Sequence, residues 1–437
     1  MQQYKQEKSK TLSDTQAKPH NTTRGLLFCG DVVAMEKRFT CTEAWQEKLR
    51  QYISFCNLEA PLLPHAPSLM PIGGGGGSLE HNNQHLAESS ANFACQTLKA
   101  GPSLHNREES IDDLVRAGFS GFMLANNHIG DYGELGLERS IEKILDSGAV
   151  CIGATCARYP DPQALYYIIN DTKIAILNAA ESQFGMLDSM SAFLGGSYGY
   201  RDCFGHEFMQ AISHIKQQVD VLICVIHAGL ENSLYPLPQF RELYKAFCDM
   251  GADCIIAHHP HVIQGYEEYR TIDSREARIF YSLGNFFFSL AQPSTDPLES
   301  QGLAVAITFE KQKIKSYELL FSQQADDVVE HINPSALYHS MESLSAPLRD
   351  EKLYREKILE IITHFYPQYM RYYEWVFLLP SKQNSLLTNI KLFIKSLFFP
   401  ERHLTSRQAL FLHNINIPTH RFVQELYLKY ILYYKEL

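Results

Sequence analysis

The stretch "LYKAFCDMGADCIIAHHPHVIQ", residues 243–264, predicts a helix, a turn and a strand in a single run. The helical part reaches Gly251, a residue suited to end it, and the apolar residues 254–257 then form a short strand. Three histidines follow within four residues, at His258, His259 and His261. Because an imidazole is costly to bury without a partner, this cluster must be solvated, hydrogen-bonded or ligated.

The same order of helix, glycine, apolar run and polar residues recurs from Gly25 to about Asn285. In "SIDDLVRAGFSGFMLANNH", for example, Gly118 ends a helix before a strand that begins near Phe122. The apolar runs are Leu26–Cys29, Ile53–Cys56, Phe122–Leu124, Ile174–Leu177, Val221–Ile226, Cys254–Ala257 and Ile279–Ser282. Helices that alternate with continuously apolar strands imply sheets covered on both faces, so the fold class is α/β.

The composition is that of a soluble globular protein, with 45% hydrophobic and 20% charged residues among 437. A net charge of -10 argues against general nucleic-acid binding, which needs clustered Lys and Arg. We see no signal peptide and no uninterrupted apolar segment long enough to span a membrane. Of the ten cysteines several lie inside apolar strands, as reduced thiols do, so we expect a cytoplasmic protein.

Three segments are expected along the chain. Residues 1–24 are polar and expected to be disordered, and residues 25–333 form the main domain with a flexible glycine-rich insertion at about 64–99. Residues 334–437 are rich in Tyr, Phe and Leu and form a helical extension. Packing on the main domain is the favoured role of its apolar stripes, while "SLLTNIKLFIKSLFF" leaves peripheral membrane contact open.

Polar residues follow the apolar runs at six strand ends. In parallel sheets, ligands bind outside the carboxyl ends of the strands, so these residues are expected to converge. They are Asp31, Glu59, Asn127 with His128, His227 with Glu231, the histidine cluster, and Asn285.

Asp, Glu, Asn and His are the ligands that hold Mn, Zn or Fe, and no cysteine lies among them. Two ions about 3.5–4 Å apart that share a carboxylate would form a hydrolytic centre, which lowers the pKa of a bridging water. In an extended backbone, His259 and His261 would face the same way, whereas His258 would face the opposite way and make a structural hydrogen bond. We therefore expect divalent metal ions, two of them, at this edge.

The motifs "CGDVV", "NLEAP", "LANNHIGDYG", "IHAGLE", "GADCIIAHHPHVIQ" and "IFYSLGNFFF" occur in the order and style of the bacterial capsule-synthesis CapA family. That family is linked to poly-γ-glutamate capsule production and resembles calcineurin-like metallophosphatases. The resemblance covers roughly residues 25–307. It implies a four-layer α/β/β/α sandwich of metallophosphatase type with metals at the strand ends.

The resemblance also implies roles for individual residues. Asp31, Glu59, Asn127, His227, His259 and His261 would bind metal, with Glu59 as the bridging carboxylate. His128 would donate to a substrate oxygen or leaving group, and Glu231 would be an extra ligand or a proton carrier.

Some residues depart from the family pattern or allow two interpretations. Val33 occupies the place of a histidine in the first phosphatase motif. Asp131 either orients His128 or belongs to an ordinary turn, with equal weight for both. Asn57 and Asn285 are expected to fix loops or lie at the rim.

Three functions remain open at this stage. The first is a metal-dependent hydrolase of CapA type acting on a phosphoester or amide-like bond in a small molecule, peptide or polymer. The second is a metal-dependent epimerase or isomerase of amino-acid or peptide substrates. The third is a non-catalytic accessory or binding subunit of an envelope-polymer synthesis complex, which the valine at position 33 favours. The oligomeric state is not predicted.

Overall fold

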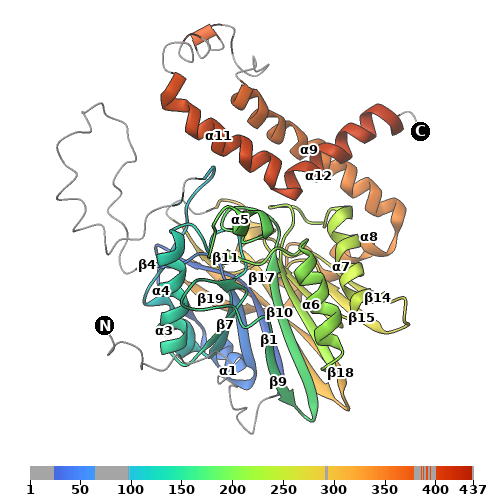
Figure 1. Cartoon of the computed structure of the whole chain (residues 1–437). Helices are drawn as coiled ribbons and strands as arrows, with labels where there is room; N and C mark the ends of the chain where they lie inside the picture. Colours follow the sequence, from blue (N-terminus) through green and yellow to red (C-terminus); the bar gives the residue numbers. More distant parts are fainter. Residues whose placement is uncertain are drawn as a thin grey trace, which may run out of the picture.

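The fold is described from a computed structural model, shown in Figure 1. The structure describes residues 24–63, 97, 99–290, 294–377 and 400–435, together with isolated positions between 385 and 394. The expected disordered segment 1–24 and the glycine-rich insertion 64–99 therefore lie almost wholly outside the described residues, as does most of the segment at 385–399.

The larger sheet combines parallel and antiparallel strands around β1. Strands β3, β6 and β7 follow β1 in parallel on one side, and β17, β18 and β19 add an antiparallel meander on the other. In spatial order the strands are β2 (Thr40–Cys41), β19 (Val328–Ile332), β18 (Lys313–Ala325), β17 (Gln301–Glu310), β1 (Leu26–Ala34), β3 (Ile53–Leu58), β6 (Phe119–Met123) and β7 (Val150–Ile152), with β16 (Asn285–Ser289) also paired to β1.

The smaller sheet has a parallel centre flanked by antiparallel edges. Its strands in spatial order are β14 (Tyr266–Arg270), β15 (Glu276–Phe280), β13 (Cys254–His258), β12 (Val221–His227), β10 (Thr172–Ala180) and β9 (Leu165–Ile169). Two short pairs complete the described strands, namely β4 (Leu62–Leu63) with β5 (Asn106–Arg107), and β8 (Ala154–Thr155) with β11 (Gly199–Tyr200).

Three apolar cores show that the chain forms four layers. Alternate residues of β1 face opposite ways, so Leu27 packs against α1, α3 and α4 while Phe28 packs against the smaller sheet. On the far side of the smaller sheet, Leu177 faces α6 and α7. The helices are α1 (Glu43–Gln51), α3 (Ser110–Ala117), α4 (Gly133–Asp146), α5 (Ser189–Phe193), α6 (His206–Lys216) and α7 (Pro238–Met250). The expected α/β/β/α sandwich is therefore confirmed, with α3 and α4 on one side and α6 and α7 on the other (Figure 1).

The two glycines expected to end helices do so. Gly118 follows α3 with φ +128° and Gly251 follows α7 with φ +134°, a conformation that a residue with a Cβ rarely adopts. Strand β13 then begins at Cys254, as expected, whereas β6 begins at Phe119, directly after the glycine and before the expected Phe122.

The C-terminal helices gather at one end of the sandwich (Figure 1). Tyr354, Ile358 and Ile362 of α9 are buried in the same apolar core as α6 and α7, and Phe422 of α12 joins them. The helices are α8 (Met341–Arg349), α9 (Glu351–Phe377), α11 (Pro400–Asn416) and α12 (Pro418–Lys429). Within the described ranges, no helix has both the length and the apolar composition required to cross a membrane.

The carboxyl ends of the central strands of both sheets meet at one edge. In the larger sheet Asp31 is in register with Asn57 of β3 and Asn285 of β16, and in the smaller sheet His227 is in register with His258. The two edges are joined directly, because His258 Nε2 lies 3.1 Å from the carbonyl oxygen of Cys29. This confirms the structural hydrogen bond expected of His258.

Gly30 allows β1 to approach the chain before β16. A Cβ at this position would lie 2.2 Å from the carbonyl oxygen of Gly284, which accepts a hydrogen bond from the Asp31 amide at 3.0 Å. Gly30→Ala is therefore expected to lower the free energy of unfolding by about 2 kcal/mol, because overpacked sites cost roughly 1–3 kcal/mol. Chemical denaturation measures this loss.

A matched control is Gly148→Ala, where a Cβ meets no atom within 4 Å and only the positive φ of +82° opposes it. Its expected loss is smaller, about 1 kcal/mol. Equal losses in the two variants would contradict the close approach at Gly30.

Candidate metal centre

Asp31 is fully buried at the end of β1 and is held by groups from both sheets. Its Oδ1 accepts a hydrogen bond of 2.8 Å from the Asn57 amide, and its Oδ2 lies 3.5 Å from His261 Nδ1. Burial would raise the pKa of Asp31, but hydrogen bonds from His261 and Asn57 hold this pKa below its ordinary value. Asp31 is therefore a carboxylate in the folded chain.

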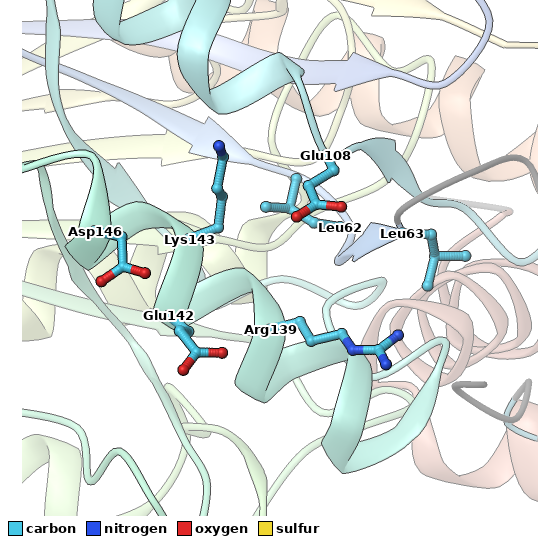
Figure 2. Close-up of a pocket in the computed structure, with 7 residues that line it drawn as sticks. All are labelled: Leu62, Leu63, Glu108, Arg139, Glu142, Lys143 and Asp146. Carbon is cyan, nitrogen blue, oxygen red and sulfur yellow. The ribbon is translucent and has the colours of Figure 1, made fainter. Parts of the chain in front are cut away.

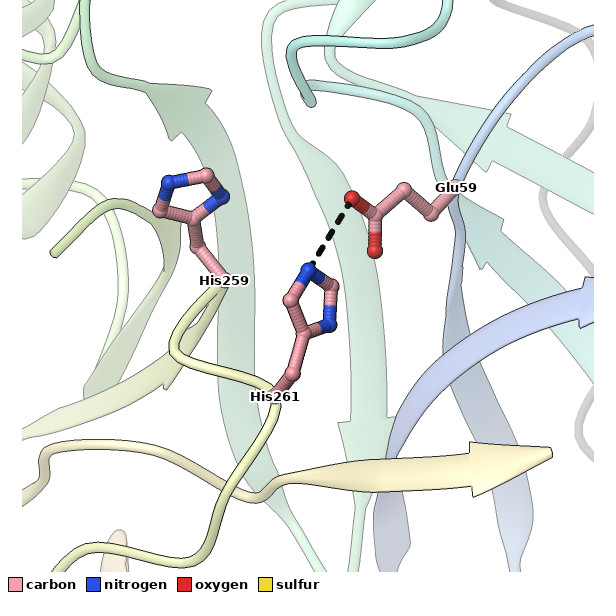
Figure 3. Close-up of side chains that lie close together, drawn as sticks. All are labelled: Glu59, His259 and His261. Atoms are coloured by element: carbon pink, nitrogen blue, oxygen red, sulfur yellow. Dashed lines mark ion pairs between the residues drawn. The ribbon is translucent and has the colours of Figure 1, made fainter. Parts of the chain in front are cut away.

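Glu59 is also fully buried, yet neither of its carboxylate oxygens has a hydrogen-bond partner among the described residues. Oε1 lies 3.6 Å from His227 Nε2 and 3.7 Å from His261 Nε2, and Figure 3 shows the latter contact. A buried acidic group without partners is strongly unfavourable. The surroundings of Glu59 thus suit bound cations.

His227 lies between the two sheets, where three side chains meet it. Its Nδ1 is 3.1 Å from the Asn57 amide, and its Nε2 is 2.9 Å from Asn127 Oδ1 and 3.0 Å from His259 Nδ1. Burial and the neighbouring imidazoles hold the pKa of His227 well below its ordinary value, and burial lowers that of His259 to about 4. Both imidazoles are therefore neutral, the form in which histidine binds metal.

His259 and His261 converge on Glu59, but not for the reason expected from the sequence. In an extended backbone the two side chains would face the same way, whereas φ is +97° at His259 and +59° at His261. These left-handed conformations place the ring centroids 5.9 Å apart. Ala60, next to Glu59, also has a positive φ of +111°. Strain of this kind, of order 1–3 kcal/mol per residue, is typical of functional sites.

The ligand-type atoms form two groups that share Glu59. One group contains Asp31, Glu59 and His227, the other contains Glu59, His259 and His261, and the atoms of each group lie within 4.8 Å of one another. Oxygen and imidazole nitrogen suit Mn, Zn or Fe, and the unpartnered oxygens of Glu59 supply the negative charge. The residues present therefore fit divalent cations.

When no cation is bound, a proton helps to offset the negative charge of the Asp31 and Glu59 carboxylates. Burial opposes protonation of His261, but the carboxylates of Glu59 and Asp31 outweigh it and hold the pKa of His261 well above its ordinary value. Burial acts in the opposite sense on Glu59 and raises its pKa, so this carboxyl group also tends to bind a proton. A metal ion would take over the charge compensation that this proton provides.

His128 lies beside the two ligand groups and is oriented by Asp131. His128 Nδ1 is 2.7 Å from Asp131 Oδ2, and the same carboxylate accepts a hydrogen bond from the Leu104 amide and forms an ion pair with Lys99. Lys99 Nζ is also 3.1 Å from His128 Nδ1. Burial and this ammonium group lower the pKa of His128. Asp131 therefore contacts the His128 imidazole and also accepts from the backbone of the Leu104 loop.

The other expected residues lie at the edge of the site or outside it. Glu231 is exposed, and its Oε1 is 3.9 Å from His259 Nε2, so neither ligand group includes it. Val33 is buried in a small apolar cluster with Ala60 and Leu104 and offers no ligand.

Sequence reasoning undervalued three residues of this site. Asn57 and Asn285 were expected to fix loops, but Asn57 contacts Asp31 and His227, and Asn285 Oδ1 lies 3.0 Å from His261 Nδ1. Glu181, one residue past β10, was not singled out, although it is buried and its Oε1 is 3.6 Å from His259 Nε2. Glu181 is the first residue after β10, but Asn178, Ala179 and Ala180 separate it from the apolar run Ile174–Leu177, so the run did not point to it.

A surface pocket of about 350 Å³ lies away from this centre, against β4 and one face of α4 (Figure 2). Two of its charged side chains are engaged within the chain, since Lys143 pairs with Asp112 and Glu142 with Arg158. The residues around it are Leu62, Leu63, Glu108, Arg139, Glu142, Lys143 and Asp146. They offer no convergent chemistry.

The chain thus forms an α/β/β/α sandwich with carboxylates and imidazoles at the joined ends of its two sheets. Residues 83–290 match the family model described as "Bacterial capsule synthesis protein PGA_cap". The resemblance to CapA proteins stated from the sequence is thereby confirmed. Asp31 and Glu59 precede the matched range, so their place in the site rests on the geometry.

Two curated relatives are named as CapA proteins. The chain is 30% identical over 214 residues to "Capsule biosynthesis protein CapA" of Bacillus anthracis, a match that covers 48% of this chain and 49% of the relative. It is also 30% identical over 187 residues to "PGA biosynthesis protein CapA" of Bacillus subtilis (strain 168), with 42% and 47% covered. The matches thus span about half the length of these relatives.

Solved structures with similarity include a phosphatase from Mycoplasma pneumoniae and a putative 5'-nucleotidase from Staphylococcus aureus in complex with alpha-ketoglutarate. The first is 14% identical with a TM-score of 0.37, over 73% of this chain and 98% of the other. The second is 14% identical with a TM-score of 0.38, over 67% and 53%.

Asn57 provides a test of the metal-free site. Asn57→Ala removes the donor to Asp31 Oδ1, so the free energy of unfolding is expected to fall by about 1–3 kcal/mol, the range for a buried acceptor left unsatisfied. Asn57→Asp is expected to cost more, because two carboxylates would then face each other. Denaturation in the presence of a chelator measures both changes, and an Ala variant as stable as the wild type would contradict this role of Asn57.

Proposed function

We propose that this chain is a CapA-type metal-dependent hydrolase that cleaves a phosphoester or amide-like bond. The observation that carries the proposal is the Glu59 carboxylate, which is fully buried, has no hydrogen-bond partner among the described residues, and belongs to both ligand groups. A structural role would require donors around this carboxylate, as Asp31 has. A carboxylate that bridges two cations instead needs both of its oxygens free of hydrogen-bond donors.

The chain offers a set of ligands for each cation. Asp31, Glu59 and His227 would hold one, and Glu59, His259 and His261 the other. Asn127 Oδ1, at 2.9 Å from His227 Nε2, is a further oxygen within reach of the first. Two divalent cations in such a site polarise the scissile group and lower the pKa of a bound water.

The protein's own contribution to the reaction centres on His128. Asp131 would fix the imidazole through Nδ1, and Lys99 contacts both members of this pair. A buried imidazole held in this way can stabilise or protonate an oxygen that gains negative charge during bond cleavage. Glu231, at the exposed edge near His259, is placed to exchange protons with solvent.

The class of substrate is also part of the proposal. The name of the Bacillus subtilis relative refers to PGA biosynthesis, which connects the family to a polymer of γ-linked glutamate. A γ-glutamyl peptide and a generic phosphodiester therefore represent the two bond types to be tested. Both are small enough to be used without knowledge of the natural polymer.

We expect the purified chain to contain up to two divalent ions by elemental analysis and to hydrolyse one of the two probes. Glu59→Gln keeps the size of the side chain but removes the charge that two cations would share. This variant is expected to lose at least one ion and most of its turnover, by at least about 100-fold. His261→Ala is expected to do the same, because it removes a ligand of one group.

Lys143→Ala, at the surface pocket away from the centre, serves as the control and is expected to keep both metal and turnover. If Glu59→Gln and His261→Ala retain the full metal content and rate of the wild type, the proposal is wrong.

Asp131→Asn separates the role of His128 from metal binding. This variant is expected to keep its ions, because Asp131 belongs to neither ligand group, while kcat falls by about 10–100-fold through loss of the charge that orients His128. Steady-state kinetics and elemental analysis on the same preparation check both statements. Loss of metal together with activity would instead assign Asp131 to the metal centre.

The accessory-subunit hypothesis keeps one supporting observation, the apolar packing of Val33 where the phosphatase motif has a histidine. It predicts a single weakly held metal ion, no turnover of either probe, and a stable partner in pull-down experiments. The epimerase hypothesis predicts instead that the γ-glutamyl peptide takes up deuterium from heavy water without cleavage.

A further inference from the structure

A buried carboxylate lies behind His259, on the side away from the other ligands. Glu181 is 1% exposed, and its Oε1 lies 3.6 Å from His259 Nε2 and accepts a hydrogen bond of 3.1 Å from the Gly229 amide. The opposite ring nitrogen, Nδ1, is 3.0 Å from His227 Nε2. Figure 3 shows the two ring nitrogens of His259 on opposite sides, one of them toward Glu59.

The second oxygen of Glu181 is held by the C-terminal extension. Thr419, in the first turn of α12, donates to Oε2 through its hydroxyl at 2.7 Å and through its amide at 3.3 Å. The Thr419 hydroxyl is also 3.1 Å from the carbonyl oxygen of Gly229, two residues past His227. Close by, the Asn416 side chain donates to the Gln183 carbonyl oxygen at 3.2 Å.

This arrangement matters for a histidine that binds through Nδ1. Such a ligand must carry its proton on Nε2, and a carboxylate that accepts from Nε2 stabilises this tautomer and fixes the ring. The Gln183 amide nitrogen lies 3.2 Å from Nε2 and 3.4 Å from Glu181 Oε1, and as a donor it can reach Nε2 only when that nitrogen carries no proton. A metal ion on Nδ1 would place the proton on Nε2, which must then find an acceptor, and the exposed Glu231 carboxylate is 3.9 Å away. Glu181 is the closer carboxylate and the one with a fixed position.

We propose that Glu181 and Thr419 are positioning residues for His259, so that the first turn of α12 is part of the metal centre. Glu181 sets the tautomer and orientation of the ring, and Thr419 holds Glu181 in place. The inference rests on the proposed function, because it requires His259 to bind a metal ion. It assigns to the C-terminal helices a role beyond covering the smaller sheet.

The experiment uses the full-length chain, freed of metal with a chelator and titrated with Mn²⁺ by calorimetry. Thr419→Val removes the hydroxyl at nearly constant volume and is expected to weaken Mn²⁺ binding by about 10–100-fold, the usual effect of losing a group that orients a ligand. Glu181→Gln is expected to have a similar effect. Thr419→Ser retains the hydroxyl and should bind within about threefold of the wild type.

The control is Thr172→Val, which removes another buried hydroxyl, at the start of β10 and thus at the opposite end of the strand from Glu181. Its Mn²⁺ affinity is expected to equal that of the wild type. The visible spectrum of the Co²⁺-loaded chain gives a second readout. It should change in Thr419→Val and Glu181→Gln and stay unchanged in Thr419→Ser and Thr172→Val.

Each outcome has a defined meaning. A wild type that binds Mn²⁺, with Thr419→Val and Glu181→Gln variants that bind it equally well, overturns this inference and leaves the proposed function standing. A wild type that binds neither Mn²⁺ nor Co²⁺ overturns both. If Thr419→Val does not fold, Glu181→Gln decides alone, since it keeps the shape of the side chain.

Discussion

The structure depends on the burial of two acidic side chains, Asp31 and Glu59, at the place where the two sheets meet. Neither is exposed to solvent, so their charge must be compensated from within the chain or by bound cations. Asp31 receives hydrogen bonds from Asn57 and from the backbone of His259, and it lies near His261. Glu59 receives none from the described residues. This difference in hydrogen bonding between Asp31 and Glu59 is the strongest indication that Glu59 binds cations.

The sandwich makes this arrangement possible because its two sheets turn their carboxyl ends to the same edge. The larger sheet supplies Asp31 and, just past β3, Glu59, while the smaller sheet supplies His227 and the turn with His259 and His261. The hydrogen bond from His258 to the Cys29 carbonyl fixes one sheet against the other at this level. Behind it the apolar core between the sheets sets their separation. A shift of one sheet by a single residue would separate the carboxylates from the imidazoles.

Much of this could be predicted from the sequence, because it depends on short-range patterns. The glycines at 118 and 251 and the apolar runs predicted the alternation of helices and strands, and the polar residue after each run predicted the common edge. What could not be predicted depends on three-dimensional detail. The left-handed backbone at His259 and His261 has no signal in "HPH", and Asn57 resembles any loop amide until its contacts with Asp31 and His227 are seen. Thr419 lies in a helix that no motif connects to the site.

The contact between Glu181 and Thr419 joins residues that are 238 positions apart in the chain. During synthesis the sandwich has all its strands available well before α12 leaves the ribosome, and domains begin to fold while the chain grows. The environment of Glu181 can be completed only when the last helices arrive. Contacts of such long range form slowly, because a large loop must close first. The contact between Glu181 and Thr419 can therefore form only after α12 has been synthesised, later than the strands of both sheets become available.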